Sequence, residues 1–255
     1  MAISVVINTY NAEKFLREVL DTVKSFDEIV ICDMESKDGT LDIAREYGCK
    51  IVTFEKKNYV SAEPARTFAI QSASSEWVLV VDADELVTKE LHDYLYERIT
   101  DPNCPAGLYI PRKNYMMDYF MKSSYPDYQL RFFRREGTVW PPHVHTFPQV
   151  QGPTEKIPMN REDLAFIHLA DTAYNTINKM NQYSENEIVK RKGVHVTMAK
   201  MIFSPFFRFF KTYILKGSIR YGKVGFIQAC NNAYYKYVVL YKALERERME
   251  KMIQK

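Results

Sequence analysis

The sequence predicts an α/β protein with a mostly parallel sheet, and three observations support this prediction. Short apolar runs typical of buried strands recur in the N-terminal third of the chain, and segments with apolar residues at helical spacing lie between them. The strand-like runs end in polar or acidic residues. Because parallel strands need crossover connections, this alternation is typical of a sheet with right-handed strand–helix–strand units.

The expected strands and helices alternate along this part of the chain. Strand-like runs occupy residues 3–8, 28–33, 50–54 and 77–81. A helix is expected after the first strand, with Asn11 as its N-cap. The apolar stripe of this helix comprises Phe15, Leu16, Val19, Leu20 and Val23. Thr40 is predicted to cap a second helix that runs to Tyr47, and residues 62–73 are expected to form a third.

The pattern changes beyond Asp163, where the strand-like runs end. Helices are expected over residues 173–192 and 206–254, which are rich in aromatic and basic side chains. The change predicts a sheet-containing domain at residues 1–170 and a helical region at residues 171–255. A chain of 255 residues with 46% hydrophobic residues is long enough to bury one large core and carry such an appendage.

Cysteine usage and apolar content favour a protein of the cytoplasm. The four cysteines lie far apart without a C-x-x-C pair, so free thiols in a reducing compartment are expected at Cys32, Cys49, Cys104 and Cys230. No secretory signal is expected, because Met1 leads directly into a strand. No stretch of ~20 apolar residues suited to a membrane span is present.

Charge is distributed unevenly along the chain. The formal net charge is +3, yet residues 188–244 contain eleven Lys or Arg and no Asp or Glu. The remainder, with 24 basic and 32 acidic residues, carries −8. This asymmetry indicates an anionic partner for the basic region, either membrane lipid or nucleic acid.

Two carboxylates directly follow the fourth strand-like run, at Asp82 and Asp84. Ligands of open α/β sheets bind at the carboxyl ends of the strands. Mg²⁺ typically takes one or two protein carboxylates and completes its shell with water and substrate phosphates. The D-x-D pattern therefore indicates a metal-diphosphate site, with a solvated turn as the structural alternative.

Three motifs, in this order and spacing, resemble glycosyltransferase family 2. They are VVINTYN at residues 5–11, VICD at 30–33 with SKDGT at 36–40, and DADE at 82–85. Further on, YPDYQLRFFR at 125–134 and FFRFFKTYIL at 206–215 are similar to the bacterial lipopolysaccharide-core branch often described as β-1,4-glucosyltransferases. The resemblance implies a GT-A (Rossmann-like) fold and inverting transfer of a sugar from a nucleotide-diphosphate donor. UDP-glucose is the first expectation for the donor, and a lipid-linked or envelope glycan such as lipopolysaccharide core for the acceptor.

The resemblance also assigns residues to the nucleotide. Thr9, Tyr10 and Asn11 are expected to meet the base, and Asp33 to accept a hydrogen bond from a uracil N–H. The structural alternatives are a helix cap for Asn11 and a turn acid for Asp33. The second turn departs from the Asp-Ser-Gly-Ser usual in the branch, because here it reads DMES at residues 33–36, which places extra bulk and charge near the base.

Donor phosphates and metal are assigned in the same way. Asp82 is expected to reach the ribose, Asp84 to hold Mg²⁺ or Mn²⁺, and Arg66 to lie near the phosphates, with an exposed helical arginine as the alternative for Arg66. His145 is a candidate metal or phosphate ligand, as one of a pair with His143, and imidazole suits Mn²⁺ better than Mg²⁺. The alternative is a structural or exposed histidine pair.

Inverting transfer needs a base for the proton of the acceptor hydroxyl. Asp127 is the first candidate, because Pro126-Asp127 precedes its strand much as the base motif does in other family members, and Glu85 is the second. The alternative for Asp127 is a loop acid paired with Arg131 or Arg134. The Val-His-Glu of the branch is Val-His-Thr here, at residues 144–146, so one candidate carboxylate is missing.

The phenylalanines at positions 206, 207, 209 and 210 flank Arg208. An interfacial segment on an anionic membrane surface, at the cytoplasmic face of the membrane, fits both features, and core packing is the alternative. Two other functions remain open. A sugar nucleotidyltransferase would use similar acids but lacks its Gly-rich loop here, and a non-catalytic protein could grip nucleic acid with the basic tail. Nucleic acid is not expected as a partner of the glycosyltransferase.

Overall fold

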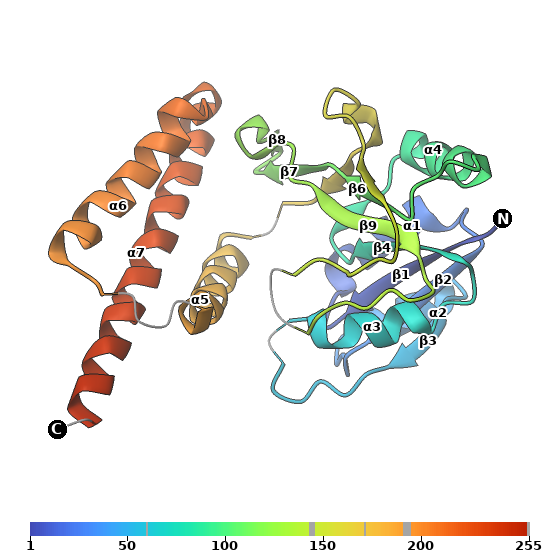
Figure 1. The fold of residues 1–255 in the computed structure, drawn as a ribbon, viewed down its shortest axis with the longest axis horizontal. Helices are drawn as coiled ribbons and strands as arrows, with labels where there is room; N and C mark the ends of the chain where they lie inside the picture. The colour runs from blue at the N-terminus through green and yellow to red at the C-terminus, as the bar shows by residue number, and fades with distance from the viewer. Residues whose placement is uncertain (60, 143–145, 171, 191–194, 254–255) are drawn as a thin grey trace. The chain divides into compact units, whose positions relative to one another are not determined.

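The computed structural model describes residues 1–59, 61–142, 146–170, 172–190 and 195–253 (Figure 1). The chain divides into two compact units. The first, here called the sheet unit, comprises Met1–Asn114 and Tyr125–Leu169. The second, the helical unit, comprises Tyr115–Ser124 and Ala170–Lys255. It includes a short hairpin, residues 115–124, that the predicted boundary at residue 170 placed in the first domain.

A seven-stranded sheet organises the sheet unit, in the order β10-β6-β9-β4-β1-β2-β3. Its strands are β1 (Ile3–Thr9), β2 (Glu28–Asp33), β3 (Lys50–Thr53), β4 (Trp77–Asp82), β6 (Gly107–Ile110), β9 (Gln129–Arg134) and β10 (Thr154–Lys156). The first four are mutually parallel, and β9 runs antiparallel to both β4 and β6. The prediction of an α/β fold with a mostly parallel sheet is therefore confirmed.

A smaller sheet has four strands. Its strands, in the order β5-β11-β7-β8, are β5 (Glu85–Leu86), β11 (Phe166–His168), β7 (Arg112–Met116) and β8 (Tyr119–Phe120). Strand β11 pairs antiparallel with β5 and parallel with β7. The prediction that strands end at Asp163 is therefore wrong, because β11 returns to complete this sheet.

Helices cover both faces of the main sheet. They are α1 (Glu13–Val23), α2 (Thr40–Glu46), α3 (Glu63–Gln71) and α4 (Lys89–Thr100). Side chains of β1 alternate between two apolar clusters, because successive side chains of a strand point to opposite faces. Val5 packs with residues of α1, α2 and α4, and Val6 packs with residues of α3. The sheet is thus the middle of three layers, and Trp77 lies buried within it.

The two predicted helix caps are wrong. Ala12 is the N-cap of α1, and the Asn11 side chain accepts a hydrogen bond from the backbone N–H of Lys37 at 2.8 Å. Thr40 lies within α2, and its hydroxyl accepts from the backbone N–H of Ala12 at 2.8 Å. The loops after β1 and β2 run side by side, so these polar side chains join two loops instead of capping their own helices.

Long helices form most of the helical unit. They are α5 (Ala173–Lys190), α6 (Met198–Phe210) and α7 (Gly222–Ile253), with short turns η1 (Lys122–Ser124), η3 (Lys211–Leu215) and η4 (Ser218–Tyr221). A further short turn, η2 (Glu162–Leu164), belongs to the sheet unit. No helix among the described residues is both long and apolar enough to cross a membrane.

The single helix expected over residues 206–254 is wrong, because the chain reverses between α6 and α7. Gly217 and Gly222 have φ values of 75° and 54°, a left-handed backbone that favours glycine. Gly225 then lets α7 pass against the preceding turn, since a Cβ at this position would lie 1.7 Å from the backbone oxygen of Ser218. The reversal allows α6 to pack along α7.

Gly225→Ala is expected to destabilise the helical unit by ~3 kcal/mol or more, because the added methyl meets the backbone of Ser218 and the turn η4 must move away from α7. Thermal or urea unfolding measures the effect. Asn232→Ala, at an exposed position of the same helix, is the control and should change stability by less than ~0.5 kcal/mol. A Gly225→Ala protein as stable as this control would contradict the close contact between α7 and the preceding turn.

Candidate active site at the carboxyl edge of the sheet

Polar residues that end neighbouring strands meet at one edge of the main sheet. Thr9 of β1 is in register with Asp33 of β2, and Asn8 is in register with Asp82 of β4. The loops that follow β1 and β4 carry Tyr10, Asn11 and Asp84, and Arg66 lies in helix α3. The structure thus brings together most of the predicted site residues, as expected for strand ends of a parallel sheet.

Asp33 is buried and holds the loop of its own strand. Its carboxylate accepts from the Thr9 hydroxyl at 2.8 Å, from the Ser36 backbone N–H at 2.8 Å and from the Ser36 hydroxyl at 2.5 Å. Three donors occupy most of its acceptor positions, so its first structural role is to order the β2 loop. The contact with a uracil N–H stays a prediction.

The two strand loops present Tyr10 and Glu35 to solvent. The Tyr10 ring is 48% exposed, and the Lys56 ammonium lies 4.8 Å from its centroid. Met34 points into the apolar core, so the bulk expected near the base at this position is absent. Glu35 is exposed and accepts from the backbone N–H of Lys56 at 3.2 Å. The extra charge at this turn therefore lies at the surface, and its predicted place near the base stays a prediction, whereas the extra bulk lies in the core.

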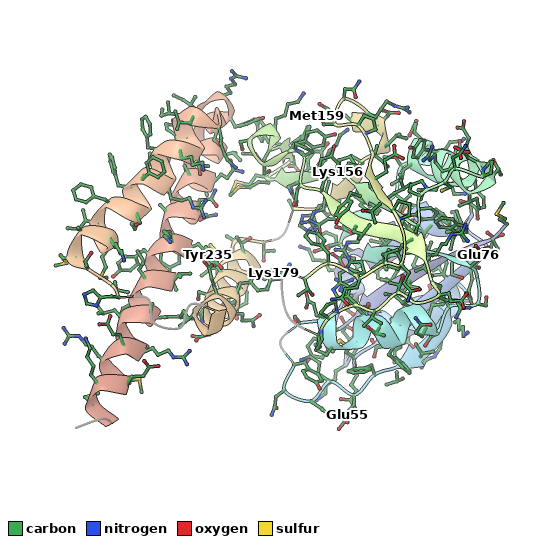
Figure 2. All side chains as sticks on the ribbon, in the orientation of Figure 1. Glu55, Glu76, Lys156, Met159, Lys179 and Tyr235 are labelled. Atoms are coloured by element: carbon green, nitrogen blue, oxygen red, sulfur yellow. The ribbon has the colours of Figure 1, made fainter. Side chains whose placement is uncertain are left out.

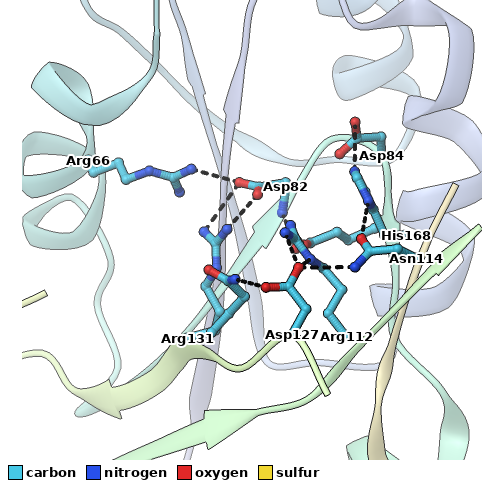
Figure 3. A network of polar contacts seen from close by, with 10 residues as sticks. Arg66, Asp82, Asp84, Arg112, Asn114, Asp127, Arg131 and His168 are labelled. Atoms are coloured by element: carbon cyan, nitrogen blue, oxygen red, sulfur yellow. Dashed lines mark hydrogen bonds and ion pairs between the residues drawn. The ribbon is translucent and has the colours of Figure 1, made fainter. Parts of the chain in front are cut away.

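Two arginines hold Asp82 (Figure 3). Arg66 Nη2 donates to Asp82 Oδ1 at 2.8 Å, and Arg131 donates to both carboxylate oxygens at 3.2 and 2.5 Å. Burial raises the pKa of Asp82, but the charges of Arg131 and Arg66 lower it more, and the pKa falls far below its usual range. Arg66 is only 7% exposed, so the interpretation as an exposed helical arginine is wrong.

The same two arginines lie against the ring of Trp140. The guanidinium carbons of Arg66 and Arg131 are 4.5 and 5.4 Å from the ring centroid. Nε and Nη1 of Arg66 and Nε of Arg131 are buried without a hydrogen-bond partner among the described residues. Buried guanidinium donors suit an anion, and phosphate oxygens match their geometry.

Asp127 lies in a second network, next to the first. Its Oδ2 accepts from Arg112 Nε and Nη2 at 2.9 and 2.6 Å and from Asn114 at 3.1 Å, while Oδ1 accepts from Gln129 at 3.1 Å. Burial raises the pKa of Asp127, but the Arg112 charge and these hydrogen bonds hold it below its usual value. The partner is Arg112, so the alternative pairing with Arg131 or Arg134 is wrong.

Glu85 is fully buried beneath this network. One carboxylate oxygen accepts from Arg112 Nη1 at 2.9 Å, and the other accepts from the backbone N–H of Asp82 at 3.0 Å. A catalytic base must reach the hydroxyl whose proton it takes. Glu85 has no exposed surface for such an approach, so the structure argues against it as the second candidate base and assigns it to positioning Arg112 and Asp82.

Asp84 faces a histidine that the sequence did not indicate. Asp84 Oδ2 lies 3.4 Å from His168 Nε2, and His168 Nδ1 lies 2.8 Å from Asn114 Oδ1. The amide oxygen accepts a hydrogen bond from Nδ1–H, so in the neutral ring the lone pair of Nε2 faces the carboxylate. Burial lowers the pKa of His168, but Asp84 raises it more. The pair therefore favours a cation, either a proton or a metal ion.

The pair fits a divalent metal in its donor chemistry. No group of three or more His, Cys, Asp or Glu gathers anywhere in the described part of the chain. Two protein ligands leave room for phosphate oxygens and water, as is usual for Mg²⁺, and the imidazole nitrogen favours Mn²⁺. His145, the histidine predicted as a ligand, lies outside the described residues, as does His143.

Sequence reasoning missed Arg112, Asn114 and His168, and it named Arg131 only as an alternative partner of Asp127. His168 ends the run Ala-Phe-Ile-His at residues 165–168, which resembles the earlier strand-like runs that end in polar residues, so a signal was present. Arg112 and Asn114 share one face of β7 because they are two residues apart in a strand. Nothing in the sequence distinguishes that strand from an ordinary polar one.

Arg112→Met is expected to lower the free energy of unfolding by about 3–5 kcal/mol, because the buried Glu85 and the half-buried Asp127 lose their shared cation. The lowered pKa of Asp127 means that its pairing stabilises the protein above the unfolded value of about 3.9 and stops doing so as the pH falls through the folded value. Urea unfolding should therefore show a difference from wild type that shrinks below about pH 4.

Arg45→Met is the matched control for this change. It removes an exposed ion pair with Asp42 and should cost less than ~1 kcal/mol. An Arg112 variant no less stable than the Arg45 variant would contradict the buried network.

Comparison with known proteins shows which family the chain is similar to. Residues 4–153 match the family model described as glycosyl transferase family 2. Over 260 aligned positions the chain is 25% identical to the lipopolysaccharide core biosynthesis glycosyltransferase LpsC of Rhizobium meliloti, covering 98% of this chain and 94% of that protein. It is also 34% identical over 100 residues to the poly(ribitol-phosphate) β-N-acetylglucosaminyltransferase TarS of Staphylococcus aureus, which covers 35% of this chain and 17% of TarS.

Solved structures share the fold across most of the chain. The crystal structure of S. aureus TarS residues 1–349 matches with a TM-score of 0.50 and 17% identity, over 98% of this chain and 92% of that one. The mannosyltransferase PcManGT from Pyrobaculum calidifontis, solved with GDP-Man and Mn²⁺, matches with a TM-score of 0.54 and 14% identity, over 95% of this chain and 87% of that one.

Proposed function

The chain belongs to glycosyl transferase family 2 and has the GT-A fold, and we propose that it is a metal-dependent, inverting hexosyltransferase that uses a nucleotide-sugar donor. One observation carries this proposal. The Asn114 amide joins the two centres of the site, because its oxygen lies 2.8 Å from His168 Nδ1 and its nitrogen donates to Asp127 Oδ2 at 3.1 Å. A metal pair and a base candidate thus share one positioning residue.

The donor diphosphate would lie at the Asp84 side of the site. Asp84 and His168 would hold Mg²⁺ or Mn²⁺, and the bound ion would supply positive charge to the leaving diphosphate. Arg66 and Arg131, with their buried unpartnered N–H groups, offer further positive charge close to Asp82. Asp82 keeps part of its surface open, so its predicted contact with the ribose remains part of the proposal.

Asp127 is the proposed base. It would take the proton of the acceptor hydroxyl while that oxygen attacks the anomeric carbon and the bond to the diphosphate breaks on the opposite face, which inverts the configuration. Its lowered pKa keeps the carboxylate ionised at neutral pH, as the role requires. The close Arg112 partner makes Asp127 a weak base. An incoming diphosphate is an anion and would compete with Asp127 for Arg112.

Donor and acceptor are proposed from the relatives. The similarity to LpsC along nearly the whole chain supports a lipid-linked or envelope glycan acceptor such as lipopolysaccharide core. UDP-glucose is the first donor to test. The basic residues of the helical unit support peripheral attachment to an anionic membrane surface at the cytoplasmic face, where nucleotide sugars are available.

Nucleotide release separates the candidate functions. Incubation with a panel of nucleotide sugars and Mn²⁺ or Mg²⁺ should release UDP from one of them, and the same ligand should raise the melting temperature. Pyrophosphate as the product would indicate a sugar nucleotidyltransferase. Gel shifts of RNA or DNA without turnover of any nucleotide sugar would overturn the proposal in favour of a nucleic-acid-binding protein.

A further inference from the structure

Helix α6 exposes an apolar face. Its exposed residues follow helical spacing and are Ile202, Phe203, Phe206, Phe207 and Phe210, with exposed fractions of 58%, 67%, 69%, 58% and 42%. Figure 2 shows rings projecting from α6 on the side away from α7. Phe209 differs, because it packs against Tyr213 and Phe226 with ring centroids 5.4 and 5.6 Å apart. The core-packing alternative therefore holds for Phe209 alone among the four clustered phenylalanines.

A pocket of about 530 Å³ adjoins this face. Its lining combines aromatic rings with cations and comprises Phe203, Ser204, Phe207, Arg208, Lys211 and Lys236. Arg208 and Lys211 are exposed and form no ion pair with any residue in the described part of the chain. Cations beside apolar rings match a ligand that carries a phosphate next to a hydrocarbon chain.

The positive charge around the pocket favours some ligands over others. Residues 188–244 carry +11 without a single acid, so a second copy of this surface would be repelled. A nucleic acid would neutralise the charge. It has no apolar interior into which the five exposed apolar side chains of α6 could insert. An anionic bilayer supplies both, because its phosphates meet the cations while aromatic rings enter the boundary between headgroups and acyl chains.

We propose that this pocket binds the phosphate of an anionic bilayer phospholipid, and that the apolar face of α6 lies in the membrane interface around it. The inference rests on the proposed membrane location and names the site responsible, but it does not depend on catalysis. The ligand class is a phosphodiester with acyl chains, held by Arg208 and Lys211 with Phe203 and Phe207 against its hydrocarbon part.

Flotation with vesicles tests whether the basic residues of the pocket bind anionic lipid. The protein should bind phosphatidylcholine vesicles that contain phosphatidylglycerol and bind pure phosphatidylcholine far less. Arg208→Glu with Lys211→Glu should lower the partition coefficient by about 25-fold or more, since each basic residue near the surface contributes roughly 5-fold. The control is Lys24→Glu with Lys89→Glu, which makes the same charge change at exposed helix positions of the sheet unit and should leave binding nearly unchanged.

A second pair of variants tests the apolar face. Phe206→Ser with Phe207→Ser should weaken vesicle binding at least ~10-fold at an unchanged melting temperature, because both rings are already exposed. Phe209→Ser should instead lower the melting temperature. Addition of inorganic phosphate or water-soluble glycerol phosphate should not displace the protein from vesicles, which separates a bilayer lipid from a free phosphate.

Several results would overturn the inference. The first is vesicle binding that both double variants retain. The second is a wild-type protein that binds RNA and not vesicles, with RNA binding lost in the variants. The third is a dimer in solution that dissociates in the Phe206/Phe207 variant. UDP release by the charge-reversed protein should match wild type. A wild-type protein that floats with vesicles but releases no nucleoside diphosphate from any nucleotide sugar of the panel would refute the proposed function and leave the lipid site standing.

Discussion

Asp127→Asn is expected to lower kcat for sugar transfer by ~10²–10⁴-fold while the Kd for the donor stays nearly unchanged. The amide keeps the shape of the side chain and can still accept a hydrogen bond from Arg112, but it cannot take a proton. The loss should therefore appear equally in kcat and kcat/KM. Steady-state transfer assays and calorimetric titration with the donor measure the two quantities.

Gln129→Leu provides the matched control for this change. Gln129 donates to the other oxygen of the same carboxylate, at 3.1 Å, so its loss disturbs the network without removing the base. We expect less than a ~10-fold effect on kcat. If the Asp127 variant were merely less stable in urea and transferred sugar at the wild-type rate, the carboxylate would be structural and another group would be the base.

Asp84→Asn is expected to reduce kcat/KM by ~10²-fold or more, because the leaving diphosphate loses the charge that a bound ion supplies. Chelation of wild-type protein with EDTA should have the same effect. Manganese affinity is a readout independent of turnover, and titration monitored by electron paramagnetic resonance should show weaker binding in the variant. Full activity in excess EDTA would refute the metal assignment.

The partner of Asp84 is tested by His168→Gln. An imidazole ligand stabilises Mn²⁺ more than Mg²⁺, so this variant should lose manganese affinity on the order of 10–100-fold and lose less for magnesium. The control is His195→Gln in the helical unit, because the His195 side chain is 70% exposed and contacts Glu247 instead of the site. Equal manganese affinity in the His168→Gln and His195→Gln variants would show that His168 is not a metal ligand alongside Asp84.

Local patterns were sufficient where the structure is itself local. The strands β1, β2 and β4 follow from apolar runs, and α1 follows from an apolar stripe that is buried in the structure except for the half-buried Phe15. The predicted caps were wrong because Asn11 and Thr40 bond to the backbone of a neighbouring loop, 26 and 28 residues away in sequence. A cap is predicted from near neighbours, whereas loop-to-loop contacts depend on how the sheet assembles.

The reversal between α6 and α7 shows the same limit. Aromatic and basic residues continue at helical spacing through Gly217, so periodicity alone indicates one long helix. The chain turns there because two glycines take a left-handed backbone and Gly225 lets the start of α7 lie close to the turn that contains Ser218. Exposure of Phe206 and burial of Phe209 then follow from the side of α6 that meets α7, a choice that spacing alone leaves open.

The sequence by itself determined the fold class, the family resemblance and the acids at the strand ends, because these depend on residue type and order along short segments. Only the tertiary structure decided the partners of those acids. Asp82 meets Arg131 across 49 residues, and Asp84 meets His168 from a strand that the pattern did not predict. Asp127 is held by Arg112, not by the nearer arginines. Ion pairs form between side chains that neighbouring strands bring within a few ångströms of each other. The spacing of apolar residues along the sequence does not determine that distance.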